Sequence, residues 1–359
     1  MARIKVRKGM PSVQLDKATF AERLKQRFYD PAFEPLKAEI DKIVDAAWDG
    51  YDDSRKAPRT RPAGPGYADP KYELSIEWIA ARDAIKQAER RHKSPASKSR
   101  ILLINGSPRS DQTCPGEMSK SFRLMEIAEE AIRRERGFEV ERLDLNRQTS
   151  EFGIQIHPCK ACVSTAMPLC HWPCSCYPNH AMGQVNDWMS ELYPRWVAAH
   201  GIMIVTPVYW YQAPSVLKLM IDRLVCADGG NPDPTTTKLK HAELAKAIEL
   251  EGWSYPRHLA GRAFGVVVHG DAAGTENLRR ALTDWLQDMG LVQASYGAVL
   301  DRYIGYYEDY ATSHAALDRD VAVQDEVRNV ARCVVNAVTL MREGRFVQPD
   351  EAVPELRPK

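Results

Sequence analysis

The spacing of hydrophobic positions along the chain changes near residue 100. Before this point, apolar side chains recur at helical intervals over residues 19–51 and 71–93, and the first of these segments is interrupted near Pro31 and Pro35. Residues 52–70 between them carry four prolines and two glycines, which predicts a loop. The pattern therefore predicts a helical N-terminal extension over residues 1–97.

From residue 100 onward, short and nearly continuous apolar runs alternate with amphipathic segments. Such runs are typical of buried parallel strands. The pattern predicts strands at 100–105, 138–145, 201–208, 263–270 and within 291–300, with helices near 119–136, 185–199, 213–226, 275–290 and 314–342. This alternation predicts an α/β fold with a doubly wound parallel sheet covered by helices on both faces.

The predicted sheet domain spans residues 98–300. Within it lie a cysteine-rich segment at 157–180 and an insertion at 227–262. Residues 301–359 are expected to form a C-terminal helical tail.

Composition and the N-terminal sequence indicate which classes of partner and which cellular compartment to expect. The chain has 359 residues, 27% of them charged, and a formal net charge of +1, which gives no reason to expect a nucleic acid or a membrane surface as partner. The N-terminus lacks the apolar core of a signal peptide, so we expect a cytoplasmic protein. Thiols stay reduced in that compartment, where clustered cysteines more often bind metal or do redox chemistry than form disulfides.

The loop after the first predicted strand is the first place to look for a ligand, because ligands lie beyond the carboxyl ends of strands in open α/β sheets. Its sequence, "NGSPRSDQTCPGEMSKS" (105–121), lacks both the dinucleotide fingerprint and the P-loop motif. It offers hydroxyls, Arg109 and Lys120 beside a helix N-terminus, a combination that suits a phosphate dianion. The alternative is an ordinary turn with a serine cap.

Two further loops lie at the same predicted edge. Tyr209, Trp210 and Tyr211 follow the third strand and offer faces for a planar ligand, although such a triplet also suits a core or a subunit interface. His269 and Asp271 end the fourth strand, where they either contact a ligand or are held in place by hydrogen bonds.

With these motifs the sequence resembles the flavodoxin-like NADPH-dependent FMN reductases, and within them the iron–sulfur flavoproteins. The matching stretches are "GSPRSDQT" (106–113), "TPVYWYQAPSVLKLMIDRL" (206–224) and "HGDAAG" (269–274). The resemblance implies a five-stranded parallel sheet in the order 2-1-3-4-5, bound FMN, and association into homodimers or homotetramers.

The resemblance also implies site residues. Ser107 and Arg109 would hold the FMN phosphate, helped by Thr113, Ser119 or both. Pro207, Val208, Tyr209 and Trp210 would border the isoalloxazine ring, and His269, Gly270 and Asp271 would approach its other side.

The implied activity is hydride transfer from NAD(P)H to FMN and on to a small acceptor: a quinone, free flavin, an azo or nitro compound, or a metal oxyanion. No protein acid or base is required, because the flavin carries the chemistry. The alternatives are an FMN electron carrier that serves protein partners, and a flavodoxin-like scaffold without flavin.

The cysteine-rich segment leaves its chemistry open. Iron–sulfur flavoproteins carry a compact C-x2-C-x2-C-x4–7-C run in this place. Here Thr165 stands at the third position, and the spacing over Cys159, Cys162, Cys170, Cys174 and Cys176 is C-x2-C-x7-C-x3-C-x-C. The alternatives are a [4Fe–4S] cluster on four of these five thiols, a zinc ion, or reduced thiols packed without metal.

Overall fold

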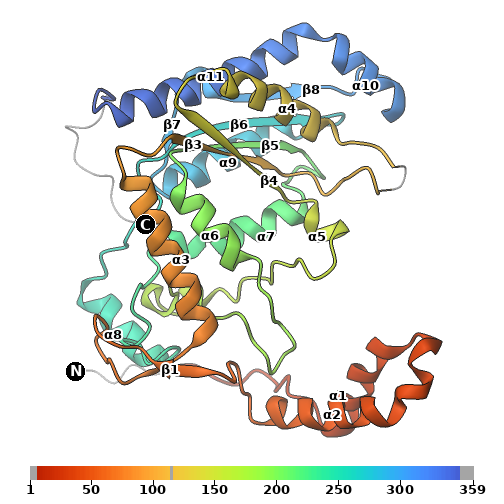
Figure 1. Ribbon diagram of the computed structural model, residues 1–359, viewed down its shortest axis with the longest axis vertical. Coiled ribbons are helices and arrows are strands. Elements are labelled where there is room, and N and C mark those ends of the chain that lie inside the picture. The colour runs from red at the N-terminus through yellow and green to blue at the C-terminus, as the bar shows by residue number, and fades with distance from the viewer. Residues whose placement is uncertain (1–5, 114–115, 348–359) are drawn as a thin grey trace. The chain divides into compact units, whose positions relative to one another are not determined.

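The computed structural model describes residues 6–113 and 116–347 and forms two compact units, neither of which is continuous in sequence (Figure 1). The first comprises residues up to Asp83, Gln155–Ser190 and Gly229–Pro256. The second comprises Ala84–Ile154, Glu191–Asp228 and the residues from Arg257 on. The cysteine-rich segment and most of the insertion thus group with the N-terminal extension.

A parallel sheet forms the centre of the second unit. Its strands are β3 (Ser99–Asn105), β4 (Phe138–Asp144), β5 (Gly201–Pro207), β6 (Ala263–Gly270), β7 (Val292–Gln293) and β8 (Val299–Tyr303). The order is β4-β3-β5-β6-β7, and β8 also pairs with β6. The predicted order 2-1-3-4-5 is therefore confirmed, but the fifth position is divided into two short strands by a 3-10 helix at Tyr296–Ala298.

Helices cover both faces of this sheet (Figure 1). On one face α4 (Lys120–Arg133) and α11 (Val321–Arg342) pack on the strands, with Ile101, Leu124 and Val334 in one hydrophobic cluster. On the other lie α6 (Met189–Ala198), α7 (Ser215–Leu224) and α9 (Thr275–Asp288). The short helix α5 (Arg147–Ser150) follows β4.

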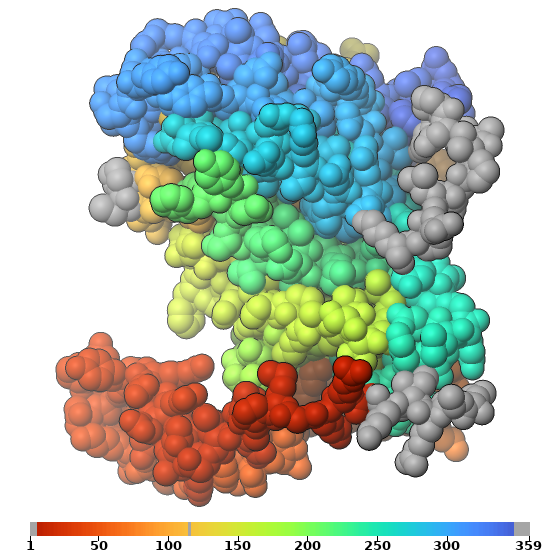
Figure 2. All heavy atoms as spheres, turned by 180° about the vertical axis from the view of Figure 1, so that it is seen from behind, coloured from red at the N-terminus to blue at the C-terminus, as the bar shows by residue number. Residues whose placement is uncertain are grey.

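The C-terminal helices belong to the core of this unit. A Cβ on Gly265 of β6 would lie 2.8 Å from a methyl carbon of Val334, so α11 crosses the sheet where a strand residue has no side chain. In the space-filling view from behind, residues from β6 through α11 form one continuous surface, coloured cyan to blue (Figure 2). The predicted helix 314–342 is two helices, α10 (Tyr310–Arg319) and α11, because Asp320 between them caps α11 by accepting a 3.1 Å hydrogen bond from the Val323 N–H.

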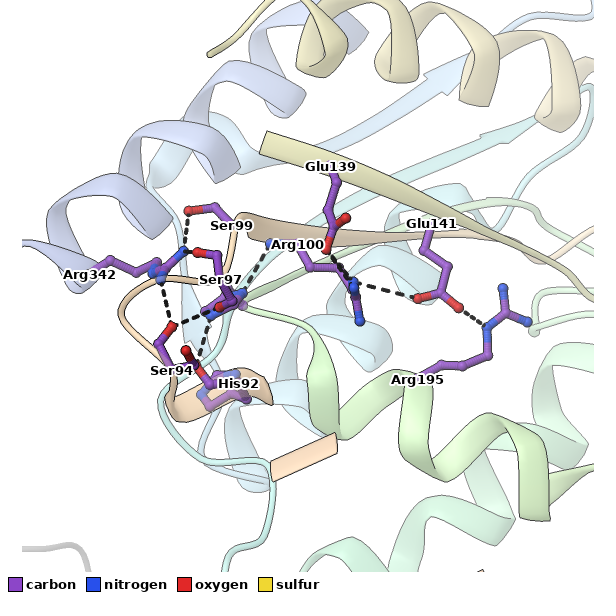
Figure 3. Close-up of polar contacts among 10 residues, drawn as sticks. His92, Ser94, Ser97, Ser99, Arg100, Glu139, Glu141, Arg195 and Arg342 are labelled. Atoms are coloured by element: carbon purple, nitrogen blue, oxygen red, sulfur yellow. Dashed lines mark hydrogen bonds and ion pairs between the residues drawn. The ribbon is translucent and has the colours of Figure 1, made fainter. Parts of the chain in front are cut away.

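Arginines fix the opposite, amino-terminal edge of the sheet (Figure 3). The guanidinium of Arg342 donates to the Ser97 carbonyl at 2.7 Å and to the Ser99 hydroxyl at 3.0 Å, which ties the end of α11 to the segment that enters β3. Arg100 of β3 donates to Glu139 of the neighbouring strand at 3.0 Å. These contacts hold the sheet edge far from the loops where a ligand is expected.

The first unit contains α1 (Lys17–Lys25), α2 (Lys37–Asp52), β1 (Thr60–Pro62), β2 (Glu73–Ser75), the start of α3 (Ile76–Lys93) and α8 (Ala242–Gly252). The short 3-10 helices of this unit are Gln26–Phe28, Pro31–Leu36, Cys162–Ser164 and Met167–Leu169, whereas Val225–Ala227 and Tyr296–Ala298 belong to the second unit.

The loop predicted at 52–70 needs correction, because Thr60–Pro62 pairs antiparallel with Glu73–Ser75. Pro62 is tolerated there because an edge strand leaves one row of N–H groups unused. The predicted helix 71–93 accordingly begins only at Ile76. No helix among the described residues is long and apolar enough to cross a lipid bilayer.

Candidate functional site: a cationic cavity at the carboxyl ends of the strands

A cavity of about 110 Å³ lies where β3, β5, β6 and β8 end. The pairing of Asn105 with Val205 and of Pro207 with His269 brings these strand ends level, so the loops after them meet. Most of the residues predicted for the site line the cavity: Ser107, Arg109, Ser119, Pro207, Val208, Tyr209, His269, Gly270 and Asp271. Thr113 and Trp210 do not line it.

One wall of the cavity is cationic. Arg109 and Lys120 both lie over the ring of Tyr310, at 4.8 Å and 5.1 Å from its centroid. The Lys120 ammonium also donates to the Ile304 carbonyl at 3.1 Å, and its burial lowers its pKa. Ser119 is the N-cap of α4 and accepts a 3.1 Å hydrogen bond from the Phe122 N–H. Two fixed cations therefore lie at the positive end of a helix dipole.

The loop after β3 is held by its own hydrogen bonds. The Ser107 hydroxyl accepts from the Arg109 N–H at 3.2 Å, and the Asn105 side chain accepts from the Ser107 N–H at 3.1 Å. Gly106 is required here, because a Cβ at this position would lie 2.5 Å from the Thr206 hydroxyl oxygen. The close approach of β3 to β5 thus fixes the start of the loop that carries Ser107 and Arg109.

His269 is a neutral, buried member of the site. Its Nε2 lies 2.7 Å from the Ser121 hydroxyl oxygen. Burial, assisted by the positive charge of Lys120, lowers the pKa of His269 to about 3. The ring can therefore position Ser121 without adding a charge to the cavity near neutral pH.

The aromatic loop after β5 is a tight turn. Tyr209 and Gln212 exchange two backbone hydrogen bonds of 2.9 Å, and Trp210 and Tyr211 between them have φ values of 46° and 65°. Both torsions lie in the left-handed region, which is costly for large side chains. Tyr209 faces the cavity, where burial raises its pKa, whereas Trp210 is 95% exposed.

Three lining residues were not predicted: Ser121, Ile304 and Tyr310. Ser121 lies in the first turn of α4, two residues after Ser119, and that spacing could have indicated it. Nothing in the sequence indicated Tyr310, because the chain beyond residue 300 looked like a separate tail.

The predicted metal residues lie in the first unit. The sulfurs of Cys162 and Cys176 are 3.4 Å apart, and the Cys159 sulfur accepts from the Ala161 N–H at 3.3 Å. Across residues 6–113 and 116–347, no group of three or more His, Cys, Asp or Glu side chains is arranged to hold a metal ion. A four-coordinate zinc ion needs four ligand atoms around one point, so the thiols as they lie do not fit that ion.

Comparison with known protein families identifies the family of this chain. The family described as NADPH-dependent FMN reductase matches residues 99–303, which is more than half of the chain. The chain belongs to this family. The matched segment contains all six strands of the sheet and most of the residues that line the cationic cavity, whereas Ile304 and Tyr310 lie beyond it.

Relatives agree with this family assignment. An iron–sulfur flavoprotein of Methanosarcina thermophila is 31% identical over 126 residues, 35% of this chain and 52% of that protein. The chain thus matches about half the length of this curated relative.

Two solved structures are similar at lower identity. A structure of RosB with a bound intermediate is 15% identical, with 73% of this chain and 91% of that chain covered and a TM-score of 0.48. A flavone reductase is 17% identical, with 69% and 65% covered and a TM-score of 0.39.

Proposed function

We propose that this FMN reductase family member binds FMN at the cationic cavity and passes electrons from NAD(P)H through it to a small acceptor. The acceptor classes are a quinone, free flavin, an azo or nitro compound, or a metal oxyanion. The observation that carries the proposal is the pair of cations, Arg109 and Lys120, at the N-terminus of α4 and beside the strand ends. A dianion there receives both charge-assisted hydrogen bonds and the helix dipole.

The residues present fit the phosphate end of FMN. A cavity of about 110 Å³ is large enough for a phosphate group but not for a whole flavin nucleotide. Ser107, Arg109, Ser119 and Lys120 would hold the phosphate, with Ser121 beside them. Thr113 lies outside the cavity lining, so its part in phosphate binding stays a prediction.

The ring end would lie along the neighbouring loops. Pro207, Val208 and Tyr209 would border one side of the isoalloxazine, and His269, Gly270 and Asp271 would approach it from the end of β6. Trp210, on the exposed turn, would reach the ring only from outside the cavity. When bound, FMN supplies the hydride acceptor and the electron store, and the protein binds it, orients it and excludes water.

The second function class is an electron carrier, and no specific observation favours it. The [4Fe–4S] cluster stays a prediction, the thiols as they lie do not fit a zinc ion, and no step proposed here depends on either. Association into a homodimer or homotetramer is likewise a prediction.

FMN titration of apoprotein, followed by steady-state oxidation of NADPH and NADH under anaerobic conditions, tests the proposal. We expect saturable uptake of one FMN per chain and continued NAD(P)H consumption with at least one acceptor class. Reduction of bound FMN without turnover on any small acceptor would instead indicate the carrier. Failure to take up FMN would contradict both.

A further inference from the structure

A carboxylate at the end of β4 supports the cationic cavity from outside its lining. Strands β3 and β4 pair in register, so Asn105 lies directly beside Asp144. The Asp144 carboxylate accepts hydrogen bonds from the side-chain amide of Asn105 at 2.9 Å and from that of Asn146 at 3.1 Å. The Asn146 N–H donates a third bond to it at 3.3 Å. One carboxylate thus contacts two side-chain amides.

Both amides extend this contact to the loop after β3. The Asn105 side-chain oxygen accepts from the Ser107 N–H at 3.1 Å, and the Asn146 side-chain nitrogen donates to the Arg109 carbonyl at 3.2 Å. The Asp144 carboxylate is therefore connected, through one amide each, to the backbone of the two loop residues that are proposed to hold the FMN phosphate.

The same contacts turn two loop carbonyls toward α5. The Pro108 carbonyl lies 2.8 Å from the Thr149 hydroxyl, and the Arg109 carbonyl accepts from Asn146. Neither Thr149 nor Asn146 lines the cavity, whereas Ser107 and Arg109 do. A carbonyl oxygen carries partial negative charge, so a loop that binds an anion has to hold its carbonyls away from the ligand.

A carboxylate is the group that can orient both amides at once. It only accepts hydrogen bonds, whereas an amide both donates and accepts. Both amides therefore turn their NH2 groups toward Asp144, which leaves the oxygen of Asn105 facing the Ser107 N–H. The second N–H of the Asn146 amide is left for the Arg109 carbonyl. A side chain at position 144 that also donates would force one of the two amides to turn round.

Stability of the folded chain does not explain this carboxylate. Burial raises the pKa of Asp144, and the hydrogen bonds from Asn146 and Asn105 offset this effect only in part. The ionised form is therefore less stable in the folded protein than in water. The two side-chain amides that it contacts both lead to the loop after β3, so we look for its role there.

We propose that Asp144 is a positioning residue for the FMN phosphate, which fixes the backbone of Ser107 and Arg109 through the amides of Asn105 and Asn146. The consequence is selectivity: the cavity prefers a flavin that carries a phosphate dianion to one that does not. This inference rests on the proposed binding of FMN at the cationic cavity. Asp144 itself does not line that cavity and acts only through the loop.

The direct test compares FMN with riboflavin, which has the same ring and ribityl chain but no phosphate. Fluorescence titration of the full-length apoprotein gives both dissociation constants for the wild type and for Asp144→Asn, a change that keeps the shape and removes the charge. We expect the FMN dissociation constant to rise by roughly tenfold or more and that of riboflavin to change by less than about twofold. Thermal unfolding of each apoprotein verifies that it is folded.

The sign of the effect separates positioning from simple electrostatics. Removal of a negative charge near a bound dianion would by itself strengthen FMN binding, whereas loss of the loop geometry weakens it. Glu139→Gln is the matched control, because it removes a carboxylate at the other end of β4, where Glu139 pairs with Arg100. We expect the control to keep the wild-type affinity for both flavins.

Two outcomes of these titrations overturn the inference alone. They are an FMN-to-riboflavin affinity ratio in Asp144→Asn that equals the wild-type ratio, and tighter FMN binding in Asp144→Asn than in the wild type. A wild-type protein that binds no FMN would instead overturn the proposed function, and this inference with it.

Double variants test the route from the carboxylate to the loop. In an Arg109→Ala background, Asp144→Asn should raise the FMN dissociation constant by a smaller factor than in the wild type, because one end of the route is already lost. Asn146→Ala breaks the same route without changing Asp144 and should also weaken FMN binding selectively. Equal factors in the two backgrounds, or an Asn146→Ala protein that binds FMN like the wild type, would overturn the inference.

Discussion

The Ser121 hydroxyl oxygen of α4 lies 2.7 Å from Nε2 of His269 at the end of β6. This hydrogen bond joins the helix that follows the first sheet strand to the strand that carries the far wall of the cavity. Because His269 is buried and neutral, the contact fixes the distance between these walls without competing for an anion. The shape of the cavity therefore depends on a pair of residues that are 148 positions apart.

Arg109→Ala should weaken FMN binding far more than it lowers the thermal stability of the apoprotein. Loss of one charge-assisted contact costs roughly 1.5–3 kcal/mol of binding free energy. Fluorescence titration measures the affinity, and calorimetry of the apoprotein measures the stability. Arg280→Ala, an exposed arginine of α9 paired with Glu276, is the control. Unchanged FMN affinity in Arg109→Ala would show that the phosphate lies elsewhere.

Tyr310→Leu should weaken FMN binding, whereas Tyr310→Phe should keep most of it. The ring lies under both Arg109 and Lys120 and holds their side chains toward the cavity. Cation–π contacts of this kind contribute about 0.5–2 kcal/mol, and phenylalanine retains the ring. The same titration measures both variants. Equal losses in the two variants would indicate that the hydroxyl, and not the ring, matters.

The apoprotein should lose stability as the pH falls from about 6.5 toward 4, in part because of His269. The pKa of His269 is about 3 in the folded state and near the usual 6.5 of histidine in the unfolded state, so the unfolded state binds a proton that the folded state does not. The stabilisation is fully present above pH 6.5 and is lost progressively below it, by up to about 1.4 kcal/mol per pH unit.

Denaturant titrations at several pH values measure this dependence. His269→Gln, which keeps a hydrogen-bonding group near Ser121, should flatten the curve. A wild-type slope in His269→Gln would contradict the assignment.

Gly106→Ala should destabilise the second unit by about 1–3 kcal/mol, because the added methyl group meets the Thr206 side chain and overpacks the strand ends. Gly297→Ala is the matched control, since its methyl group would lie 3.6 Å from the nearest atom, the Cys333 sulfur. We expect the control to stay within about 0.5 kcal/mol of the wild type in chemical denaturation. Similar stabilities for the two variants would show that the loop after β3 yields easily.

The hydrophobic pattern of each segment was sufficient to predict where the main strands of the sheet lie. The predicted strands at 100–105 and 263–270 agree with the bounds of β3 and β6 to within one residue. Strands that are buried on both faces are apolar at nearly every position, so their ends are easy to recognise in the sequence. The division of the fifth strand and the break between α10 and α11 were missed. Both depend on single contacts, such as the helix cap that Asp320 provides, and the spacing of apolar residues gives no sign of such contacts.

The sequence by itself determined which segments form the strands and that the loops after them share one edge, because strand ends in a parallel sheet lie side by side. The order of the strands followed from the resemblance to the FMN reductases. Only the tertiary structure decided that Tyr310 lies under Arg109 and Lys120, and that Lys56 and Lys240 meet the cysteine-rich segment. Each of these contacts joins residues separated by long stretches of chain. Burial and charge compensation bring such residues together, and neither is visible until the whole chain is folded.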